Sequence, residues 1–374
     1  MACKWPLSRE ERRCLTACTL VCKSWLPLAQ GLLYYSVIVK SGRDYPYRNT
    51  GTFRSKALLQ QSHILEFTRS LSIYVRGKSA ATVPLPSENN SLNGSQTHPR
   101  IPEFFSLLAH TPKLRYLKLS VHWALKNICP FEPHIQDWLL SLVLPIEALD
   151  IAICQFFDRR STFPYDLVGI WPTIRALRLS TTENKGPLPE RPNICLRELR
   201  LPHPHSLAVI KWLLPPPLPN QQSNLRFLEL DHITEEVRTV LSNHGNSVST
   251  LALGLQPSFE IACLFTRLEE FVIAGPFWRS PLPALPRTLK HIRLVCGPVS
   301  TGFAAAVAQV VPILPDLRVI SIEENFTANE QYLALKEACE AHRVEILVSS
   351  LDSSGRPVVS AYQSHNMSAT SVTE

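Results

Sequence analysis

The stretch Leu114-Arg-Tyr-Leu117-Lys-Leu119 decides the fold, because the same pattern returns along most of the chain. The pattern is an apolar residue, two variable residues, a second apolar residue, one variable residue and a third apolar residue. Nine copies are present, with central residues spaced 20 to 32 positions apart: Leu117, Leu149, Leu177, Leu199, Leu228, Leu251, Phe271, Ile292 and Ile320. One copy is a weak signal in an apolar sequence, whereas nine in phase indicate a repeat array.

The spacing inside the pattern is that of a β-strand. The second and third apolar residues are two positions apart, so they share one face of a strand, and the residue between them lies on the other face. One such strand cannot bury its apolar face alone, whereas stacked repeats form a continuous core and a parallel sheet. The sequence therefore predicts the α/β class, as a solenoid with a parallel sheet.

The period resembles that of leucine-rich repeats, which is about 20–29 residues with one short strand per repeat. Regular repeats of this kind often carry Asn or Cys three residues after the last apolar position. Only Cys154 and Asn325 match that position here. We therefore expect an irregular array without a full ladder of side chains at this turn.

The amino-acid composition argues against a nucleic-acid-binding protein and against a membrane protein. The chain has 374 residues, 45% of them apolar, and a formal net charge of +7, but no block of Lys and Arg, which argues against nucleic-acid binding. Ten cysteines lack paired spacings, which favours reduced thiols in a cytoplasmic or nuclear protein. No run of eighteen apolar residues is present, so we expect no membrane span.

Motifs for catalysis are absent from the sequence. We find no phosphate-binding G-x-x-x-x-G-K loop, no H-E-x-x-H, no G-x-S-x-G and no Gly-rich dinucleotide turn, so we expect no enzyme and no cofactor. Cys14, Cys18 and Cys22 follow one line along a predicted helix and cannot surround a metal, so we assign them to packing. His203, His205 and His232 are interpreted as turn residues, and no metal site is expected.

The N-terminal stretch 8–39 is the second informative region. Ser8 and Glu11 form a capping box that opens a helix, on which Cys14, Cys18, Val21, Cys22 and Trp25 share one apolar stripe. Leu20 lies on the other side of this helix. Pro27 ends it, and the following residues predict a short helix that runs into a strand ending near Val39.

The segments Leu20-Val-Cys-Lys23, Trp25, Leu28-Ala29 and Leu33-Tyr-Tyr35 resemble the second half of an F-box. They look most like fungal F-box proteins in which this motif precedes irregular leucine-rich repeats. In that family the motif usually opens with a Leu-Pro dipeptide and an apolar helix further upstream, and the sequence begins too late to include that helix.

The resemblance implies partners. An F-box binds a Skp-type adaptor, which connects it to the cullin core of a ubiquitin ligase, and the repeats that follow hold a protein substrate. The residues that match the motif's core and adaptor surface are Leu20, Val21, Cys22, Trp25 and Leu28. We favour core packing for Val21, Cys22 and Trp25, and direct adaptor contact for Leu20.

The expected organisation has four parts. Residues 1–39 form a partial F-box-like segment, 40–62 a connector, 63–349 the repeat array with a disordered insertion at 77–102, and 350–374 a disordered tail. The chain is thus interpreted as the substrate-receptor subunit of an SCF-type ligase. The alternative is a leucine-rich-repeat scaffold that has lost adaptor binding.

The variable residues of the strands are the candidates for substrate contact, because they face away from the apolar core. Those selected are Lys118, Arg178, Arg200, Glu229, Asp231 and Arg293. We expect Arg178, Arg200 and Glu229 to form a charge ladder across neighbouring strands, which lie about 4.8 Å apart. The alternative is a solvated sheet face whose ion pairs contribute only ~0–1 kcal/mol each.

Overall fold

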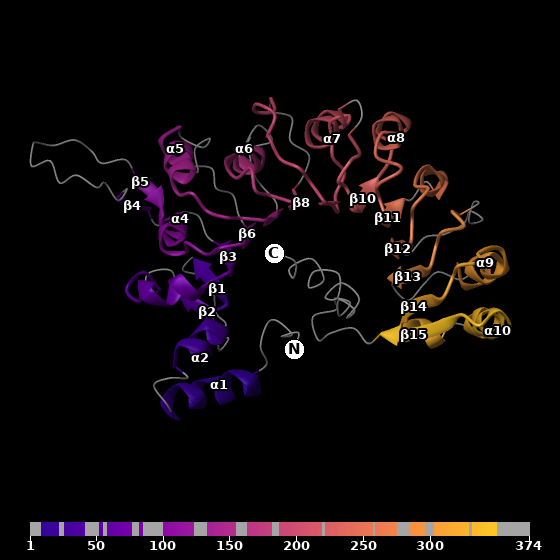
Figure 1. The fold of residues 1–374 in the computed structure, drawn as a ribbon, viewed down its shortest axis with the longest axis horizontal. Helices are drawn as coiled ribbons and strands as arrows, with labels where there is room; N and C mark the ends of the chain where they lie inside the picture. Colours follow the sequence, from indigo (N-terminus) through magenta and orange to yellow (C-terminus); the bar gives the residue numbers. More distant parts are fainter. Residues whose placement is uncertain are drawn as a thin grey trace, which may run out of the picture. The chain divides into compact units, whose positions relative to one another are not determined.

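The computed structural model describes residues 9–21, 26–41, 52–54, 58–76, 82–84, 100–122, 133–154, 163–181, 187–218, 221–256, 259–274, 285–295, 303–328 and 331–349. The chain divides into two compact units, of which the first covers Cys3–Leu196 and the second Arg197–Glu374. Both units have the predicted α/β architecture, with one strand per repeat (Figure 1).

The sheet of the first unit is parallel, in the order β2-β1-β3-β6-β7-β8. Its strands are β1 Ser36–Ser41, β2 Thr52–Arg54, β3 Ser70–Arg76, β6 Tyr116–His122, β7 Ala148–Cys154 and β8 Ala176–Ser180. Two further strands, β4 Thr82–Pro84 and β5 Arg100–Pro102, form a separate antiparallel pair.

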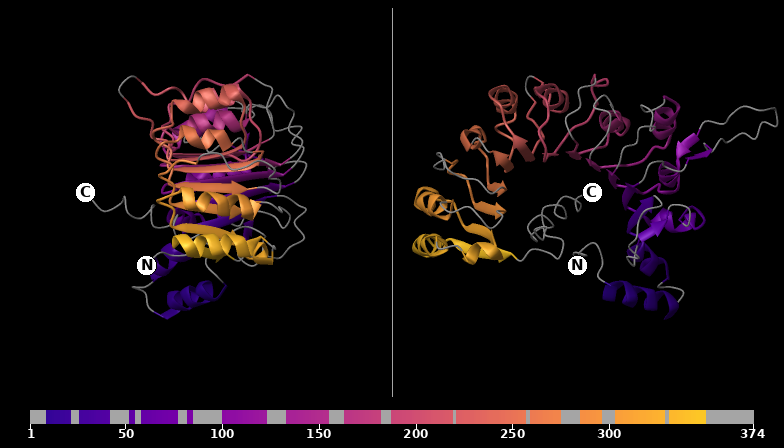
Figure 2. Two further views of the ribbon diagram at one scale, coloured as in Figure 1. Left: turned by 90° about the vertical axis from the view of Figure 1, so that its right-hand side faces the viewer. Right: turned by 180° about the vertical axis from the view of Figure 1, so that it is seen from behind.

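Helices in the first unit precede the sheet or connect its strands. They are α1 Arg9–Val21, α2 Leu26–Leu33, the 3₁₀ helix η1 Ser62–Phe67, α4 Glu103–Ser106, the 3₁₀ helix η2 Leu107–His110, α5 Pro133–Ser141 and α6 Phe163–Ile170. The connecting helices α5 and α6 lie on one side of the strands (Figures 1 and 2). Helix α1 contacts α2, and α2 contacts η1, so the N-terminal helices belong to this unit.

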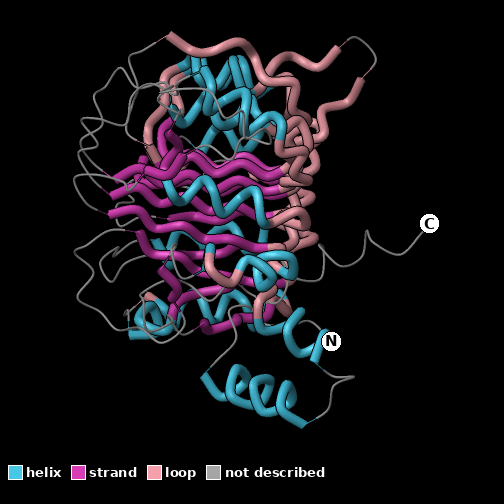
Figure 3. The backbone as a smooth tube through the Cα atoms, turned by 90° about the vertical axis from the view of Figure 1, so that its left-hand side faces the viewer, coloured by secondary structure: helices cyan, strands magenta, loops and turns pink. Residues whose placement is uncertain are grey.

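The second unit repeats the arrangement in the strand order β9 to β15, again parallel. Its strands are β9 Glu198–Leu201, β10 Phe227–His232, β11 Thr250–Gln256, β12 Glu270–Ala274, β13 His291–Val295, β14 Val319–Glu323 and β15 Glu345–Ser349. Its helices are α7 Leu207–Leu213, α8 Glu235–Ser242, η3 Phe259–Leu264, α9 Phe303–Val310, η4 Val311–Ile313, η5 Glu324–Ala328 and α10 Tyr332–His342. Helices and strands form separate layers (Figure 3).

The repeated leucines form the core, as the sequence predicts. In the first unit Leu117, Leu149 and Leu177 are register partners, and in the second Leu199, Leu228 and Leu251 are. All six side chains are buried. Along each strand, the residues that alternate with the buried apolar residues lie on the other face of the sheet, which confirms the period of two.

Backbone carbonyls just before most of the strands fix the alignment of one strand with the next. In the first unit the carbonyl of Arg115 accepts hydrogen bonds from the backbone N–H groups of both Glu147 and Ala148, at 2.8 and 2.9 Å. In the second unit the Glu269 carbonyl likewise accepts from Lys290 and His291, at 2.8 and 3.0 Å. A carbonyl oxygen has two lone pairs and can serve both donors. Each repeat is thereby aligned with the next at one fixed residue.

Tight turns lead into many of the strands and explain some of the prolines. The N–H of Leu114 donates to the Thr111 carbonyl, and the N–H of Leu317 donates to the Leu314 carbonyl. The second residue of these turns is Pro112 or Pro315. Proline presets the backbone angle that this turn position needs. These prolines therefore position the strand that follows.

The structure corrects parts of the predicted organisation. Strand β1 pairs with β3 and so belongs to the sheet rather than to a separate 1–39 segment, and β2 lies inside the predicted connector 40–62. Strands β4 and β5 occupy the two ends of the 77–102 insertion, where we expected disorder. The rest of that insertion, 42–51 and the 350–374 tail lie outside the described residues.

Helix α1 begins where the sequence predicts, but its cysteine stripe is not a packed core. Cys14 is exposed and Cys18 is only half-buried, so the assignment of the cysteines to packing does not hold for Cys14 in the described part of the chain. Ser8 and Cys22 lie outside the described residues. Helical periodicity places the cysteines on one face, but it cannot supply another element to cover that face.

We expect Leu228→Ala to lower the free energy of unfolding by about 2–5 kcal/mol, because the side chain is fully buried and its removal leaves a cavity. Urea-induced unfolding followed by circular dichroism measures the change. The control is Leu218→Ala, since Leu218 is exposed and its truncation should shift stability by only about 0.5 kcal/mol. Equal effects of the two changes would contradict the assigned core.

A second prediction concerns pH. Burial lowers the pKa of His244, partly opposed by a hydrogen bond with the Leu214 backbone, and its Nδ1 lies 2.7 Å from Ser223 Oγ. Below the ordinary histidine pKa of about 6.5, the unfolded chain therefore binds a proton more readily than the folded chain, so stability falls as pH drops.

Hydrogen exchange of the α8 amides, corrected for the intrinsic rate, should show less protection at pH 5.5 than at pH 7.5. His244→Gln should reduce this difference, and His110→Gln, at an exposed position, should not. An unchanged difference in the His244 variant would exclude His244 as its source.

Candidate functional site

The face of each sheet opposite the helices is here called the open face. It carries the residues that alternate with the buried apolar ones. Directly aligned neighbours in the first unit are Ser72, Lys118, Asp150 and Arg178. The corresponding row in the second unit is Arg200, Glu229, Ala252, Val272, Arg293 and Ser321.

The first polar group is the Asp150 cluster, formed by Tyr116, Lys118, Asp150 and Arg178. Lys118 Nζ lies 3.1 Å from Asp150 Oδ2, and the two side chains are only 16% and 8% exposed. The Tyr116 hydroxyl donates to the same carboxylate oxygen over 3.4 Å. Water screens this pair less than an exposed one, so the carboxylate holds both donors in fixed positions.

Arg178 adds a second cation to the Asp150 cluster. It is the register partner of Asp150 on β8, and its Nε atom is buried without a hydrogen-bond acceptor among the described residues. Burial raises the pKa of Tyr116, and the negative charge of Asp150 raises it further, so this hydroxyl remains a donor. Asp150 is thus aligned with a cationic residue on each neighbouring strand. The Nε–H of Arg178 remains available to a hydrogen-bond acceptor.

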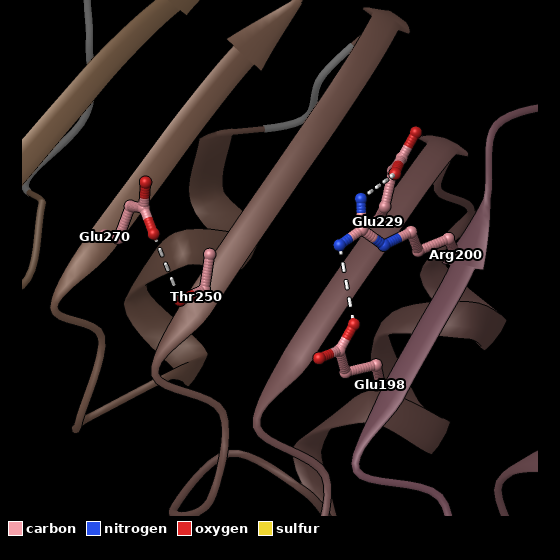
Figure 4. Close-up of polar contacts among 5 residues, drawn as sticks. All are labelled: Glu198, Arg200, Glu229, Thr250 and Glu270. Carbon is pink, nitrogen blue, oxygen red and sulfur yellow. Dashed lines mark hydrogen bonds and ion pairs between the residues drawn. The ribbon is translucent and has the colours of Figure 1, made fainter. Parts of the chain in front are cut away.

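The second polar group is the Arg200 cluster, formed by Glu198, Arg200, Phe227 and Glu229. Figure 4 shows the three charged residues of this cluster. Arg200 Nη2 lies 3.4 Å from Glu198 Oε2, and Nη1 lies 3.9 Å from Glu229 Oε2. The guanidinium carbon is 4.1 Å from the centre of the Phe227 ring. These side chains are half-buried, and ion pairs that remain in contact with water add little stability. Their effect here is to fix the plane of the guanidinium against the ring.

The third polar group is the His291 cluster, formed by Thr250, Glu270, His291 and Ser321. His291 Nδ1 lies 3.3 Å from Glu270 Oε1, and His291 Nε2 lies 2.8 Å from Ser321 Oγ. The Thr250 hydroxyl donates to Glu270 Oε2 over 3.4 Å, which ties β11 to the group (Figure 4).

Charges and hydrogen bonds keep Glu270 ionised. Burial by itself would raise the pKa of this carboxyl group. The hydrogen bond with His291, the positive charge that His291 carries when it is protonated, the charge of Arg293 and the Thr250 hydroxyl together outweigh burial. The net result is a pKa below the usual glutamate range. The open face of the second unit therefore carries a fixed negative charge beside an imidazole.

All six residues selected for substrate contact lie on strands in the predicted alternation: Lys118, Arg178, Arg200, Glu229, Asp231 and Arg293. Asp231 also explains why position 254 is glycine. A Cβ atom at position 254 would overlap the Asp231 carboxylate, so any larger residue at this position would displace the Asp231 side chain. The contact between Arg200 and Glu229 agrees with the expected ladder, whereas the aligned neighbour of Arg178 on β7 is Asp150.

Several residues that organise these clusters were not among the candidates predicted from the sequence. Asp150 occupies the variable position of its own copy of the pattern, so the signal was present in the sequence. Glu270 and Ser321 are also at strand positions of period two, but no motif distinguishes them. Their contacts arise between different repeats, which the sequence of one repeat does not specify.

The predicted adaptor residues are described only in part. Leu28 is 72% exposed on α2, and Leu32, one turn further along the same helix, is 39% exposed. Leu20 and Val21 lie in α1, but their side chains are outside the described part of the structure, as are residues Cys22 and Trp25 entirely. α2 thus presents apolar side chains to solvent.

The described residues contain neither a metal-binding group nor a membrane-spanning helix. No group of three or more His, Cys, Asp or Glu side chains in this part of the chain is arranged to hold a metal ion. Within the same residues, no helix combines the length and apolar character needed to cross a bilayer.

Comparison with known proteins gives little guidance on function. No protein-family model matches the chain, and no curated protein matches it. One solved structure that resembles it is the leucine-rich repeat-containing protein LegL7 from Legionella pneumophila, at 18% sequence identity and a TM-score of 0.35. That alignment covers 71% of this chain and 84% of LegL7. At this level of similarity, function does not transfer from one protein to the other.

We expect Asp150→Ala to destabilise the first unit by about 2–3 kcal/mol, because it leaves the largely buried Lys118 without its carboxylate partner and removes the negative charge aligned with Arg178. Urea unfolding of the variant measures this loss. Glu147→Ala is the matched control on the same repeat, since its ion pair with Arg115 has side chains 57% and 50% exposed and should contribute ~0–1 kcal/mol. A smaller loss for Asp150→Ala than for the control would contradict the ordered cluster.

Proposed function

We propose that this chain is a protein-binding repeat array that holds a protein ligand on the open face of its sheets. The observation that carries the proposal is the alignment of half-buried charged side chains from consecutive repeats, above all the Asp150 cluster with its unused Arg178 donor. Solenoid repeats present extended surfaces that suit protein ligands.

The mixture of charges favours a protein over a nucleic acid. Lys118, Arg178 and Arg200 alternate with Asp150 and Glu229 on the open faces. A phosphate backbone would be repelled by the carboxylates, whereas a protein segment can place donors and acceptors opposite both signs. Complementary charges of this kind give selectivity between partners more than raw affinity.

Preorganisation supports the same proposal. Arg200 is held over Phe227 between two carboxylates, and Lys118 is held against Asp150. Side chains that are already ordered lose less conformational entropy when a ligand binds. Arg and Tyr are also the residue types enriched at the energetic centres of protein interfaces.

The test uses peptides selected from a random display library on the purified full chain. Some selected peptides should protect the strands of the first unit from hydrogen exchange. Arg178→Glu should raise the Kd of such a peptide about tenfold, which corresponds to 1.4 kcal/mol. The matched control is Arg175→Glu, an exposed residue just before the same strand, which should leave the Kd within about threefold. Selected peptides that protect only the helices from hydrogen exchange would exclude the open face.

The finer proposal concerns α1 and α2. On the strength of the F-box resemblance of residues 20–35, we infer that these helices attach the array to a Skp-type adaptor and so to a cullin ubiquitin ligase. The bound protein would then be a ubiquitination substrate. The exposed apolar pair Leu28 and Leu32 on α2 supports this assignment, because an unpaired apolar surface of this type suits a partner helix. The alternative is a scaffold that binds no adaptor.

Titration of the full chain with a purified Skp-type adaptor separates the two alternatives. Adaptor binding should weaken at least tenfold in Leu28→Asp, a loss of about 1.4 kcal/mol or more. Leu333→Asp is the control, since Leu333 is similarly exposed on α10 in the second unit. Leu20→Asp tests the contact that the sequence analysis favours. If the unaltered chain does not bind the adaptor, the ligase assignment is excluded and the scaffold alternative remains.

A further inference from the structure

Three consecutive repeats of the second unit place a carboxylate, an imidazole and a hydroxyl in one line. Glu270 on β12 and His291 on β13 are direct register partners, and Ser321 on β14 is the diagonal neighbour of His291, whose own partner is Val319. Glu270 Oε1 is 3.3 Å from His291 Nδ1, and Ser321 Oγ is 2.8 Å from His291 Nε2. The two ring nitrogens therefore serve two different groups.

The chemistry of these partners assigns the proton on a neutral imidazole ring. An ionised carboxylate can only accept a hydrogen bond, so Nδ1 carries the proton and Nε2 is left as the acceptor for the Ser321 hydroxyl. The low pKa of Glu270 agrees with an ionised carboxylate at neutral pH. Carboxylate on Nδ1 and hydroxyl on Nε2 is the arrangement by which histidine activates a serine nucleophile.

A cationic residue is aligned with the serine on the neighbouring strand. Arg293 on β13 is the direct register partner of Ser321 on β14. A guanidinium at this position can stabilise the negative oxygen that forms when a hydroxyl attacks a carbonyl or phosphoryl group. Ser321 is 8% exposed, which restricts the site to small electrophilic groups.

We infer that Ser321 is an activated nucleophile that hydrolyses small acyl esters, with His291 as general base and Glu270 as the positioning residue. The Ser321 oxygen forms a bond to the acyl carbon and its proton passes to His291 Nε2. The ester C–O bond breaks and the departing alcohol takes that proton. Water then attacks the acyl-serine, gives a proton to His291, and releases the carboxylic acid as the proton returns to Ser321. The hydrolysis does not require the protein binding proposed above, although Ser321 lies on the same open face.

The test is covalent labelling of the full chain with a small alkyl fluorophosphonate, mapped by peptide mass spectrometry. The Ser321 oxygen bonds to phosphorus, fluoride leaves, and the proton passes to His291. We expect Ser321 to be labelled at least about 100-fold faster than Ser180, an open-face serine of β8 whose aligned neighbour is Ala152. Equal labelling of the two serines, or none, would overturn the inference and leave a structural hydrogen-bond network.

Variants identify the roles without relying on one substitution that could unfold the chain. His291→Gln should reduce Ser321 labelling by about 100-fold or more, with the circular dichroism spectrum unchanged. Glu270→Gln should slow labelling and release of p-nitrophenol from p-nitrophenyl acetate, and Glu270→Asp should restore part of both rates. A purely structural role predicts no dependence of labelling on the carboxylate in folded variants. Labelling that survives in folded His291→Gln would also contradict the mechanism.

Discussion

The structure depends on backbone carbonyls that lie just before most of the strands and accept two N–H groups from the next repeat. In the first unit the carbonyls of Arg69, Arg115 and Glu147 do this, and in the second those of Arg197, Arg226, Ser249, Glu269 and Lys290 do. These shared acceptors fix the register of parallel strands at one residue per repeat. A slip of one residue would turn every leucine of that strand toward solvent, so the hydrophobic effect and the hydrogen bonds enforce the same alignment.

Fixed register gives the open face its chemistry. Because neighbouring strands are aligned residue by residue, each polar cluster is assembled from adjacent repeats rather than from one segment. Lys118 and Asp150 meet in this way, as do Arg200 and Glu229. The line from Glu270 through His291 to Ser321 spans three repeats. A substitution in one repeat therefore acts mainly on clusters shared with its neighbours, in agreement with the nearest-neighbour energetics of solenoids.

The N-terminal helices and the strand that follows them bury their apolar residues to different extents. Strand β1 is integrated into the sheet through β3, and its Val37 and Val39 are buried. Helix α2, immediately before it, leaves Leu28 exposed, and α1 leaves Cys14 exposed. Exposed apolar residues also occur in the array, for example Leu333, so exposure alone does not distinguish the two helices. Leu28 is a candidate for adaptor contact because its exposure coincides with the F-box resemblance of the surrounding sequence.

The sequence by itself determined the repeat, the strand positions and the face of each residue, because a period of two and a recurring apolar pattern are local properties. It placed Lys118, Arg178, Arg200, Glu229, Asp231 and Arg293 on strands facing away from the core. Apolar spacing at residues 134–143, 206–214, 235–241 and 302–311 likewise predicts helices, and α5, α7, α8 and α9 lie at these positions to within a few residues. Only the tertiary structure decided which side chains meet. The pairing of Lys118 with Asp150, 32 residues later, and of His291 with Ser321, 30 residues later, depends on the lengths of the loops between strands and on register. The exposure of Cys14 also could not be predicted from the sequence, because a helical pattern defines one face of a helix but not which element covers that face.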